Sequence, residues 1–417
     1  MKILWLCNVR FSDKDVSGTG SWLQPLADAV NKTDGYEVVN FTVAACGKFH
    51  KETVNGVAQY VAPIRSVRKL QTERAWIKEI GKYVREVEEK EKPDIVQIWG
   101  TEGIWAQIFL QGDIQTKCFL DMQGLKFEIA RYYMADLRAP ELKQFLSLND
   151  MKAPWRFWMY KRHQFKRQGE VERKCLNLMK DISVQSEWVE NQIKALNPSA
   201  NIYHTKIMLR PPFYSSKKWE WHECGDNPII FTSSSGSRTY KGLHILLQTL
   251  AVLKNTYPKV QLRVAGSFMR RSTFGYEGFE RYIDKLIDKL NVRDNITFLG
   301  VLNANQIIEE LLSANVCVVP SFIESYCLGL AEAMMIGTPC VVSFAGAMPC
   351  IARCGEEALF YNSQDYATAA TMVIRVLNDK DLANMLSMKA QNHRMIDNNP
   401  LDVLNTQLEI YKRFLGE

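Results

Sequence analysis

Residues 320–339 read Pro320-Ser-Phe-Ile-Glu-Ser-Tyr-Cys-Leu-Gly-Leu-Ala-Glu-Ala-Met-Met-Ile-Gly-Thr-Pro339, and they follow a short apolar run, Val316 to Val319. The run has no polar alternation and therefore predicts a strand that is buried on both faces, as strands of parallel sheets are. Two carboxylates, Glu324 and Glu332, stand eight residues apart. Eight steps of an α-helix end roughly 80° from the starting direction. We therefore expect Glu324 in the loop after the strand and Glu332 one turn or more inside the following helix.

A strand, a turn and a new helix N-terminus together form a site for an anionic group such as phosphate, because the first backbone N–H groups of the helix are unpaired. A carboxylate on either side of that site can accept hydrogen bonds from sugar hydroxyls. The combination indicates a nucleotide sugar as the ligand. The alternative is a capped surface helix with two solvated glutamates. The strand before the segment and the sequence Gly337-Thr-Pro339-Cys-Val-Val after it disfavour that alternative.

The segment resembles the Glu-x7-Glu signature of the retaining GT-B glycosyltransferases of the glycosyltransferase family 4 type. The resemblance implies that Glu324 contacts the donor sugar and acts in catalysis, and that Glu332 contacts the ribose of the nucleotide. It also implies that the residues at the helix start bind the donor: Ser325, Tyr326, Cys327 and Leu328. The family usually has a glycine where Cys327 stands, and the cysteine side chain narrows the approach of the backbone to the phosphate.

Composition agrees with a two-domain protein in the cytoplasm. The chain has 417 residues, which is too long for a single core, and its 47% apolar and 24% charged residues are ordinary for a soluble globular protein. Its ten cysteines mostly lie in apolar runs, as reduced thiols do. Met1 to Cys7 predicts a first strand rather than a signal peptide, and no apolar run approaches the length of a membrane-spanning helix. A net charge of +6 is too small to indicate nucleic acid as a partner.

Strand-like and helix-like segments alternate along the chain, which predicts an α/β fold whose parallel sheets are covered by helices on both faces. The alternation is interrupted between Arg210 and Asn227 and then restarts. We therefore predict two doubly wound, Rossmann-like domains, residues 1–212 on the acceptor side and residues 225–396 for the nucleotide sugar. By the resemblance the architecture is GT-B, with the domains facing each other across a cleft and a helix at residues 400–417 packing back on the first domain.

Two cations beside a Gly/Ser-rich turn are candidates for binding the diphosphate of the donor. The turn Thr232-Ser-Ser-Ser-Gly-Ser-Arg-Thr-Tyr-Lys-Gly242 follows a predicted strand and precedes a predicted helix, so its backbone N–H groups can face an anion. The family has an Arg and a Lys here, the Lys followed by Gly, and Lys241 with Gly242 matches that pair. The family's Arg usually lies five or six residues before the Lys, at Ser235 or Gly236 in this chain. Whether Arg238 replaces it stays open.

The first half of the chain offers two further candidates. Gly18, Thr19 and Gly20 lie between the first predicted strand and helix, where the family has a glycine-rich loop under the donor phosphates and the acceptor. Family members often have a catalytic His after the strand that corresponds to residues 116–122. Gln123 stands in that neighbourhood, and an amide can donate and accept hydrogen bonds but cannot carry a proton. We interpret Asp121 as the cap of a turn.

No metal and no cofactor other than the donor substrate is predicted. Asp13-Lys-Asp15 and Asp379-Lys-Asp381 have the spacing of a metal-binding Asp-x-Asp, but neither follows a convincing buried strand, and both are typical of turns. None of the six histidines has a metal-ligand spacing with another. Lys241, Arg238 and the helix N-terminus are expected to do what a divalent cation would do.

Residues 131–174 interleave basic and aromatic side chains, most densely from Trp155 to Arg167. This pattern suits an anionic membrane surface at the inner face of the membrane, or a charged lipid-linked acceptor. It also suits a helix packed on its own domain with its Lys and Arg heads reaching to solvent. We favour the packed helix, because the aromatic residues do not form one helical stripe.

The sequence and the resemblance together predict a metal-independent, retaining glycosyltransferase. It would move a hexose from a UDP- or GDP-linked sugar to a hydroxyl of a saccharide or lipid-linked acceptor, in polysaccharide or lipopolysaccharide assembly. The leaving phosphate is thought to act as the base in this family, so a protein His is not required. Two alternatives stay open: a nucleotide-sugar epimerase of the same architecture, and a non-catalytic subunit that binds a nucleotide sugar.

Overall fold

The computed structural model describes residues 1–13, 22–65, 71–143, 145, 158–233, 238–268 and 278–416. The chain divides into two compact units. The first unit comprises Met1–Phe127, Arg167–Arg210 and Asp397–Glu417, and the second comprises Glu128–Lys166 and Pro211–Ile396.

The first unit is built on an eight-stranded sheet with the order β3-β4-β2-β1-β5-β6-β7-β8. All neighbouring strands are parallel except β3 and β4, which form an antiparallel hairpin at one edge. The strands are β1 (Lys2–Cys7), β2 (Glu37–Ala44), β3 (His50–Val54), β4 (Val57–Pro63), β5 (Ile95–Trp99), β6 (Cys118–Asp121), β7 (Asp181–Val184) and β8 (Asn201–His204). The helices are α1 (Leu23–Asn31), α2 (Glu73–Glu91), α3 (Trp105–Leu110), α8 (Glu187–Leu196) and α17 (Pro400–Leu415). The helix α7 (Trp158–Leu178) belongs to this unit from Arg167 onward.

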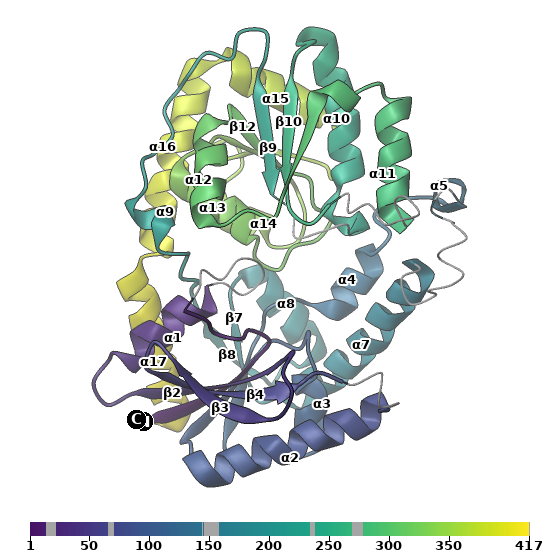
Figure 1. Ribbon diagram of the computed structural model, residues 1–417. Coiled ribbons are helices and arrows are strands. Elements are labelled where there is room, and N and C mark those ends of the chain that lie inside the picture. Colours follow the sequence, from purple (N-terminus) through teal and green to yellow (C-terminus); the bar gives the residue numbers. More distant parts are fainter. Residues whose placement is uncertain are drawn as a thin grey trace. The chain divides into compact units, whose positions relative to one another are not determined.

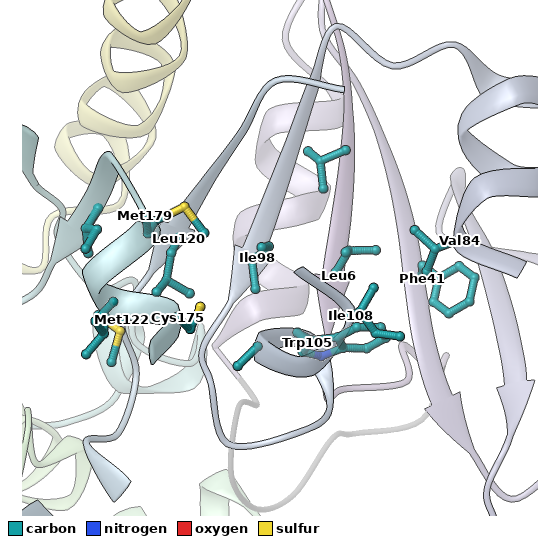
Figure 2. Close-up of a cluster of buried hydrophobic side chains, with 14 of the residues drawn as sticks. Leu6, Phe41, Val84, Ile98, Trp105, Ile108, Leu120, Met122, Cys175 and Met179 are labelled. Atoms are coloured by element: carbon teal, nitrogen blue, oxygen red, sulfur yellow. The ribbon is translucent and has the colours of Figure 1, made fainter. Parts of the chain in front are cut away.

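Helices cover both faces of this sheet because its strands are apolar on both sides. On β1, Leu4 and Leu6 join a core cluster to which α2, α3, α7 and α8 contribute, and part of that cluster is drawn in Figure 2. Trp5 points to the opposite face, where its Nε1 donates to Tyr411 Oη of α17 at 3.0 Å. A strand that buries alternate side chains against two helical layers reads as a continuous apolar run, as residues 3–7 do.

The second unit is built on a six-stranded, fully parallel sheet with the order β11-β10-β9-β12-β13-β14. The strands are β9 (Ile229–Ser233), β10 (Gln261–Ala265), β11 (Ile296–Gly300), β12 (Val316–Val319), β13 (Cys340–Ser343) and β14 (Leu359–Tyr361). The main helices are α10 (Leu243–Thr256), α11 (Gly278–Lys289), α12 (Ala304–Ser313), α13 (Leu328–Ile336), α15 (Tyr366–Asn378) and α16 (Lys380–Asp397). Figure 1 shows α12 and α13 on one side of the strands and α10 and α11 on the other.

The predicted α/β class is confirmed, because each unit is a doubly wound parallel sheet. The hairpin of β3 and β4 was not predicted. The division also differs from the predicted domains in one segment, since Glu128–Lys166 groups with the second unit and not with the first. Among the described helices, none is long and apolar enough to cross a membrane.

Candidate active site

The candidate site of the second unit lies where the strand order of its sheet reverses. The chain moves from β9 outward through β10 and β11, then returns to the other side of β9 with β12. Crevices outside the carboxyl ends of the strands at such a switch point are the usual ligand sites of open α/β sheets. Lys241 comes after β9 and Glu324 comes after β12, so the topology brings the two side chains together although they are 83 residues apart.

Lys241 and Glu324 form a short ion pair. The Nζ of Lys241 donates to Oε1 of Glu324 at 2.6 Å, and the Ser321 hydroxyl donates to the same oxygen at 2.6 Å. The side chains are 19% and 13% exposed. Burial is the largest single effect and lowers the pKa of Lys241, but the Glu324 carboxylate together with Tyr240 and Cys327 raises the pKa above its ordinary value. Lys241 is therefore a fixed positive charge at the pH of the cell.

Gly242 permits the close approach of the two loops. Its φ is 73°, in the left-handed region, and a Cβ there would lie 1.8 Å from the carbonyl oxygen of Pro320. The loops are also joined by a hydrogen bond from Phe322 N to Tyr240 O at 2.7 Å. A side chain at position 242 would push the Lys241 loop away from the Glu324 loop.

Arg238 and Lys241 flank one aromatic ring. Arg238 Nη1 donates to the Tyr240 hydroxyl at 2.8 Å, and Lys241 Nζ lies 5.9 Å from the centre of the Tyr240 ring. Lys241 ends the short 3₁₀ turn Thr239–Lys241, and Arg238 is the residue just before it. The Tyr240 hydroxyl thereby holds the Arg238 guanidinium next to this turn. The positions of these two side chains do not show a contact with phosphate. Binding of the diphosphate by Arg238 therefore stays a prediction.

The signature segment has the predicted local structure. Glu324 lies in the loop after β12, and Glu332 lies within α13 with 7% of its surface exposed. Cys327 precedes the first residue of α13, Leu328, and has φ 94° and ψ 80°. That conformation is in the left-handed region, which costs a non-glycine residue free energy. Burial, followed by the Glu324 charge, raises the pKa of the Cys327 thiol, which therefore stays protonated.

A buried chain of polar contacts reaches the signature segment from α16. Glu357 Oε2 lies 2.8 Å from His393 Nδ1, and His393 Nε2 lies 2.9 Å from Nη2 of Arg394. Arg394 can only donate, so His393 accepts at Nε2 and donates from Nδ1 to the carboxylate. Nη1 of Arg394 in turn lies 3.4 Å from the Tyr326 hydroxyl. This chain links Tyr326, a predicted donor-binding residue, to α16.

The first unit places Gln123 at the carboxyl end of β6, directly beside Asp121. Gln123 Nε2 donates to Asp121 Oδ1 at 2.6 Å. The interpretation of Asp121 as a turn cap is wrong, because Asp121 is the last residue of β6 and is fully buried. Burial raises its pKa to about 7 despite hydrogen bonds from Ser183, Gln123 and Gln185.

The remaining predicted candidates are not all described. Gly18, Thr19 and Gly20 lie outside the described residues, as do Ser235 and Gly236. Within the described ranges, no group of three or more His, Cys, Asp or Glu side chains could hold a metal ion. Helix α7 begins with exposed side chains, including Met159 at 51% and Tyr160 at 49% exposure.

Sequence reasoning missed several residues that shape these sites. Ser321 holds the Glu324 carboxylate, Tyr240 links the two cations, and Asp121 anchors Gln123. The position of Asp121 at the end of an apolar run, two residues before the predicted Gln123, was a signal for the last of them.

Comparison with known proteins agrees with the geometry of the second unit. Residues 216–393 match the family of glycosyl transferases, group 1. The D-inositol 3-phosphate glycosyltransferase of Corynebacterium urealyticum is 27% identical over 159 residues, which are 37% of this chain and 36% of that protein. An uncharacterised glycosyltransferase of Methanocaldococcus jannaschii is 30% identical over 145 residues, 34% of this chain and 35% of that protein. The chain thus matches about a third of the length of these two relatives.

Solved glycosyltransferase structures share the fold over nearly the whole chain. Sucrose-phosphate synthase from Thermosynechococcus elongatus has a TM-score of 0.73 and 18% identity, covering 99% of this chain and 99% of that chain. HepE of Anabaena, solved in complex with UDP-glucose, has a TM-score of 0.66 and 14% identity, covering 99% and 100%. These likenesses confirm the predicted fold class, two Rossmann-like domains of the GT-B type.

Proposed function

We propose that this chain is a retaining glycosyltransferase that moves a sugar from a nucleotide-diphosphate donor to a hydroxyl of an acceptor. The observation that supports this most is the Lys241–Glu324 pair, which stands between the carboxyl ends of β9 and β12 and the start of α13. A cation, a carboxylate and a helix N-terminus at a switch point are the groups that a diphosphate joined to a sugar requires. The match of residues 216–393 to a glycosyltransferase family supports the same class.

Each residue of the pair has one role in the proposed reaction. Lys241 binds the diphosphate and stabilises the negative charge that develops on the leaving phosphate. Glu324 exchanges its bond with Lys241 for hydrogen bonds from the donor sugar and orients the anomeric carbon. Glu332 binds the ribose, and the backbone at Cys327 and Leu328 binds the phosphates. Gln123 of the first unit stays a predicted site residue.

The chemistry requires no protein base. The bond between the anomeric carbon and the phosphate oxygen breaks, and the acceptor oxygen bonds to the same face of that carbon. The acceptor proton passes to the leaving phosphate oxygen. The nucleoside diphosphate and the glycosylated acceptor are the products, and Lys241, Arg238 and the helix N-terminus do the work that a divalent metal does elsewhere.

A thermal-shift panel of nucleoside diphosphates and nucleotide sugars tests this proposal. A ligand at 100 times its Kd stabilises the folded state by about 2.7 kcal/mol, which raises the melting temperature measurably. UDP and UDP-glucose come first because HepE was solved with UDP-glucose, and GDP and GDP-mannose test the other base. If no nucleotide shifts the melting temperature, the assignment of this site is wrong.

Assays of the compound that binds then separate the three candidate functions. Release of nucleoside diphosphate that depends on an added hydroxyl acceptor supports the transferase. Conversion of the donor sugar without any acceptor favours an epimerase of the same architecture. Affinity without turnover of any tested acceptor favours a non-catalytic binding subunit.

We also propose that the acceptor is a saccharide or lipid-linked intermediate of polysaccharide or lipopolysaccharide assembly, reached at an anionic membrane surface. The exposed start of α7 supports this, because Met159 and Tyr160 are exposed there beside exposed Lys161 and Arg162. Co-sedimentation with vesicles that contain a fifth phosphatidylglycerol tests it, with pure phosphatidylcholine vesicles as the control. Equal binding to both vesicles, or to neither, contradicts the membrane contact.

A further inference from the structure

His244 is a buried histidine at the start of α10, and its ring depends on one carboxylate. Its Nε2 lies 2.7 Å from Oδ1 of Asp136, and the two side chains are 1% and 28% exposed. Its Nδ1 is also buried and has no hydrogen-bond partner among the residues that the structure describes. An unpaired polar atom in the interior costs free energy, so the contact with Asp136 is what offsets the burial of this ring. Both residues belong to the second unit.

The Asp136 carboxylate is the acceptor of this bond. Burial is the largest single effect and by itself raises the pKa of Asp136, but His244, with smaller contributions from the backbone and Arg138, lowers the pKa below its ordinary value. An ionised carboxylate can only accept, so Nε2 of His244 carries the proton and donates it. The bond between Asp136 and His244 is therefore charge-assisted, which makes it stronger than a bond between two neutral groups.

The His244 ring supports the loop that carries Glu324. The ring stacks on Phe322, with centroids 5.7 Å apart and planes inclined by 10°, and it meets Phe279 of α11 edge to face at 5.9 Å. Phe322 is buried and lies two residues before Glu324. Aromatic pairs at these spacings attract each other, so a shift of the His244 ring moves the support of the Glu324 loop.

One turn of the chain, from Tyr133 to Asp136, holds the loop of Lys241 on both of its sides. The Thr239 hydroxyl, two residues before Lys241, donates to the carbonyl oxygen of Tyr133. His244, three residues after Lys241, bonds to Asp136. The two contacts join residues that are 106 and 108 positions apart in the sequence. The loop of Lys241 is therefore fixed by a distant segment of the chain as well as by its own sheet.

We propose that Asp136 and His244 are positioning residues of the diphosphate site, which hold Lys241 and the Glu324 loop in the geometry that binds the donor. The inference rests on the proposed function, which places the diphosphate at Lys241. The two residues act through Phe322 and the backbone of the Lys241 loop, and not by contact with the substrate. Binding sites depend on such supporting side chains, because a binding group that is free to move must be ordered at a cost in affinity.

The affinity for UDP in variants of Asp136 tests this proposal. UDP, or whichever nucleoside diphosphate of the panel binds, is titrated by calorimetry into the full chain, so the readout does not depend on turnover. Asp136→Ala leaves both nitrogens of His244 without a partner, and the Kd is expected to rise roughly 3- to 10-fold, which corresponds to the loss of one hydrogen bond. Asp136→Asn keeps an oxygen that accepts from His244 Nε2, and its Kd is expected to stay within about twofold of the wild-type value.

Glu190→Ala is the matched control. Glu190 lies 3.3 Å from Nε2 of His204 in the first unit, and its side chain is 26% exposed, close to the 28% of Asp136. The variant removes a carboxylate from a histidine as Asp136→Ala does, but its Kd for UDP is expected to equal the wild-type value. Melting curves show that each variant is folded at the temperature of the titration. A lower melting temperature with an unchanged Kd in Asp136→Ala shows a merely structural role and overturns the inference.

A double-mutant cycle with His244→Phe shows whether Asp136 acts through His244. Phenylalanine keeps a ring against Phe322 and leaves no buried nitrogen unpaired, but it cannot donate to Asp136, so the Kd is again expected to rise roughly 3- to 10-fold. Asp136→Ala is then expected to add nothing in this background. An equal rise from Asp136→Ala in both backgrounds, or a wild-type Kd in His244→Phe, overturns the inference. If no nucleotide binds to the wild type, the proposed function has failed separately, and the inference fails with it.

Discussion

Lys241 and Glu324 form an ion pair in which Nζ and Oε1 lie 2.6 Å apart. Removing one charge of a buried pair leaves the other without a partner, so the two residues should respond differently to substitution. In the proposed function, the diphosphate competes with Glu324 for Lys241, whereas the sugar competes with Lys241 for Glu324. Substitutions at Lys241 and Glu324 therefore give the most direct test of the proposed function.

We predict that Glu324→Gln keeps or strengthens the binding of UDP while it strongly lowers the turnover rate. The amide frees Lys241 for the phosphate, but it no longer accepts strong hydrogen bonds from the sugar, and kcat should fall about 100-fold or more. Calorimetric titration of UDP and initial rates with the nucleotide sugar measure the two effects. Lys241→Met should instead weaken UDP at least tenfold, and Lys389→Met, at an exposed surface pair, should change neither. Loss of UDP binding in Glu324→Gln with retention in Lys241→Met contradicts the assigned roles.

At the scale of elements, the turn before α10 and the loop after β12 meet at one glycine. We predict that Gly242→Ala lowers the melting temperature and the activity together, because a Cβ would meet Pro320 O at 1.8 Å and the φ of 73° is strained for alanine. A loss of about 2–4 kcal/mol in the free energy of unfolding is expected from the clash and the strain combined.

Gly355→Ala separates these two causes. Gly355 has a similar φ of 78° but nothing within 4 Å of an added Cβ, so it measures the backbone strain without the clash. Equal destabilisation by both substitutions, with no effect on activity, shows that the approach of the two loops is not what Gly242 is needed for.

Glu172 of α7 is a second buried acid, and it bonds to Thr101, just after β5. Burial raises its pKa from 4.5 to about 7. The native state therefore holds a proton between these pH values that the unfolded chain has lost. The contribution to stability is complete below pH 4.5 and is lost as the pH rises through 7, at a cost of about 3 kcal/mol. We predict that Glu172→Gln, which has no proton to lose, gains melting temperature relative to the wild type between pH 5 and 8. A difference that is constant across this window excludes the shifted pKa.

Local sequence patterns predicted the loop and the helix that carry Glu324 and Glu332. The contacts that depend on which strands pair with each other could not be predicted. Glu324 in a loop and Glu332 in a helix follow from helical periodicity alone. The bond between Lys241 and Glu324 depends on β12 lying beside β9, which no local pattern specifies. The burial of Asp121 likewise depends on a partner strand that starts sixty residues later, at Asp181.

The missed hairpin has a different reason. Asn55-Gly56 between β3 and β4 is a strong turn signal, and both residues have positive φ, 50° and 81°. The sequence of β3, residues 50–54, is half-exposed and largely polar, as an edge strand is, and it therefore lacks an apolar run of the kind seen in β1 and β12.

At the scale of the whole molecule, each unit is assembled from segments far apart in the chain. In the first unit, Tyr411 of α17 donates to Gln97 Oε1 at 2.6 Å and accepts from Trp5 at 3.0 Å, and all three residues are buried. The ring of Phe414 packs on Phe119 with centroids 5.2 Å apart. The helix at residues 400–415 is thus part of the first unit's core.

We predict that Tyr411→Phe destabilises the protein by about 2–4 kcal/mol, because it leaves the buried amide of Gln97 and the indole N–H of Trp5 without their partner. Chemical denaturation followed by tryptophan fluorescence measures the change. Tyr257→Phe, whose hydroxyl donates to Asn378 at an exposed site, is the control and should cost less than about 0.5 kcal/mol. Equal costs in the two variants contradict a core role for α17.

The ribosome makes all eight strands of the first sheet before residue 205 and the helix that packs on Trp5 and Gln97 only after residue 399. At roughly 5–20 residues per second, a nascent chain spends about 10–40 s with that aromatic surface bare. Chaperones that recognise apolar patches should therefore hold the growing polypeptide until synthesis passes residue 415, and a message that ends at codon 399 should yield aggregates.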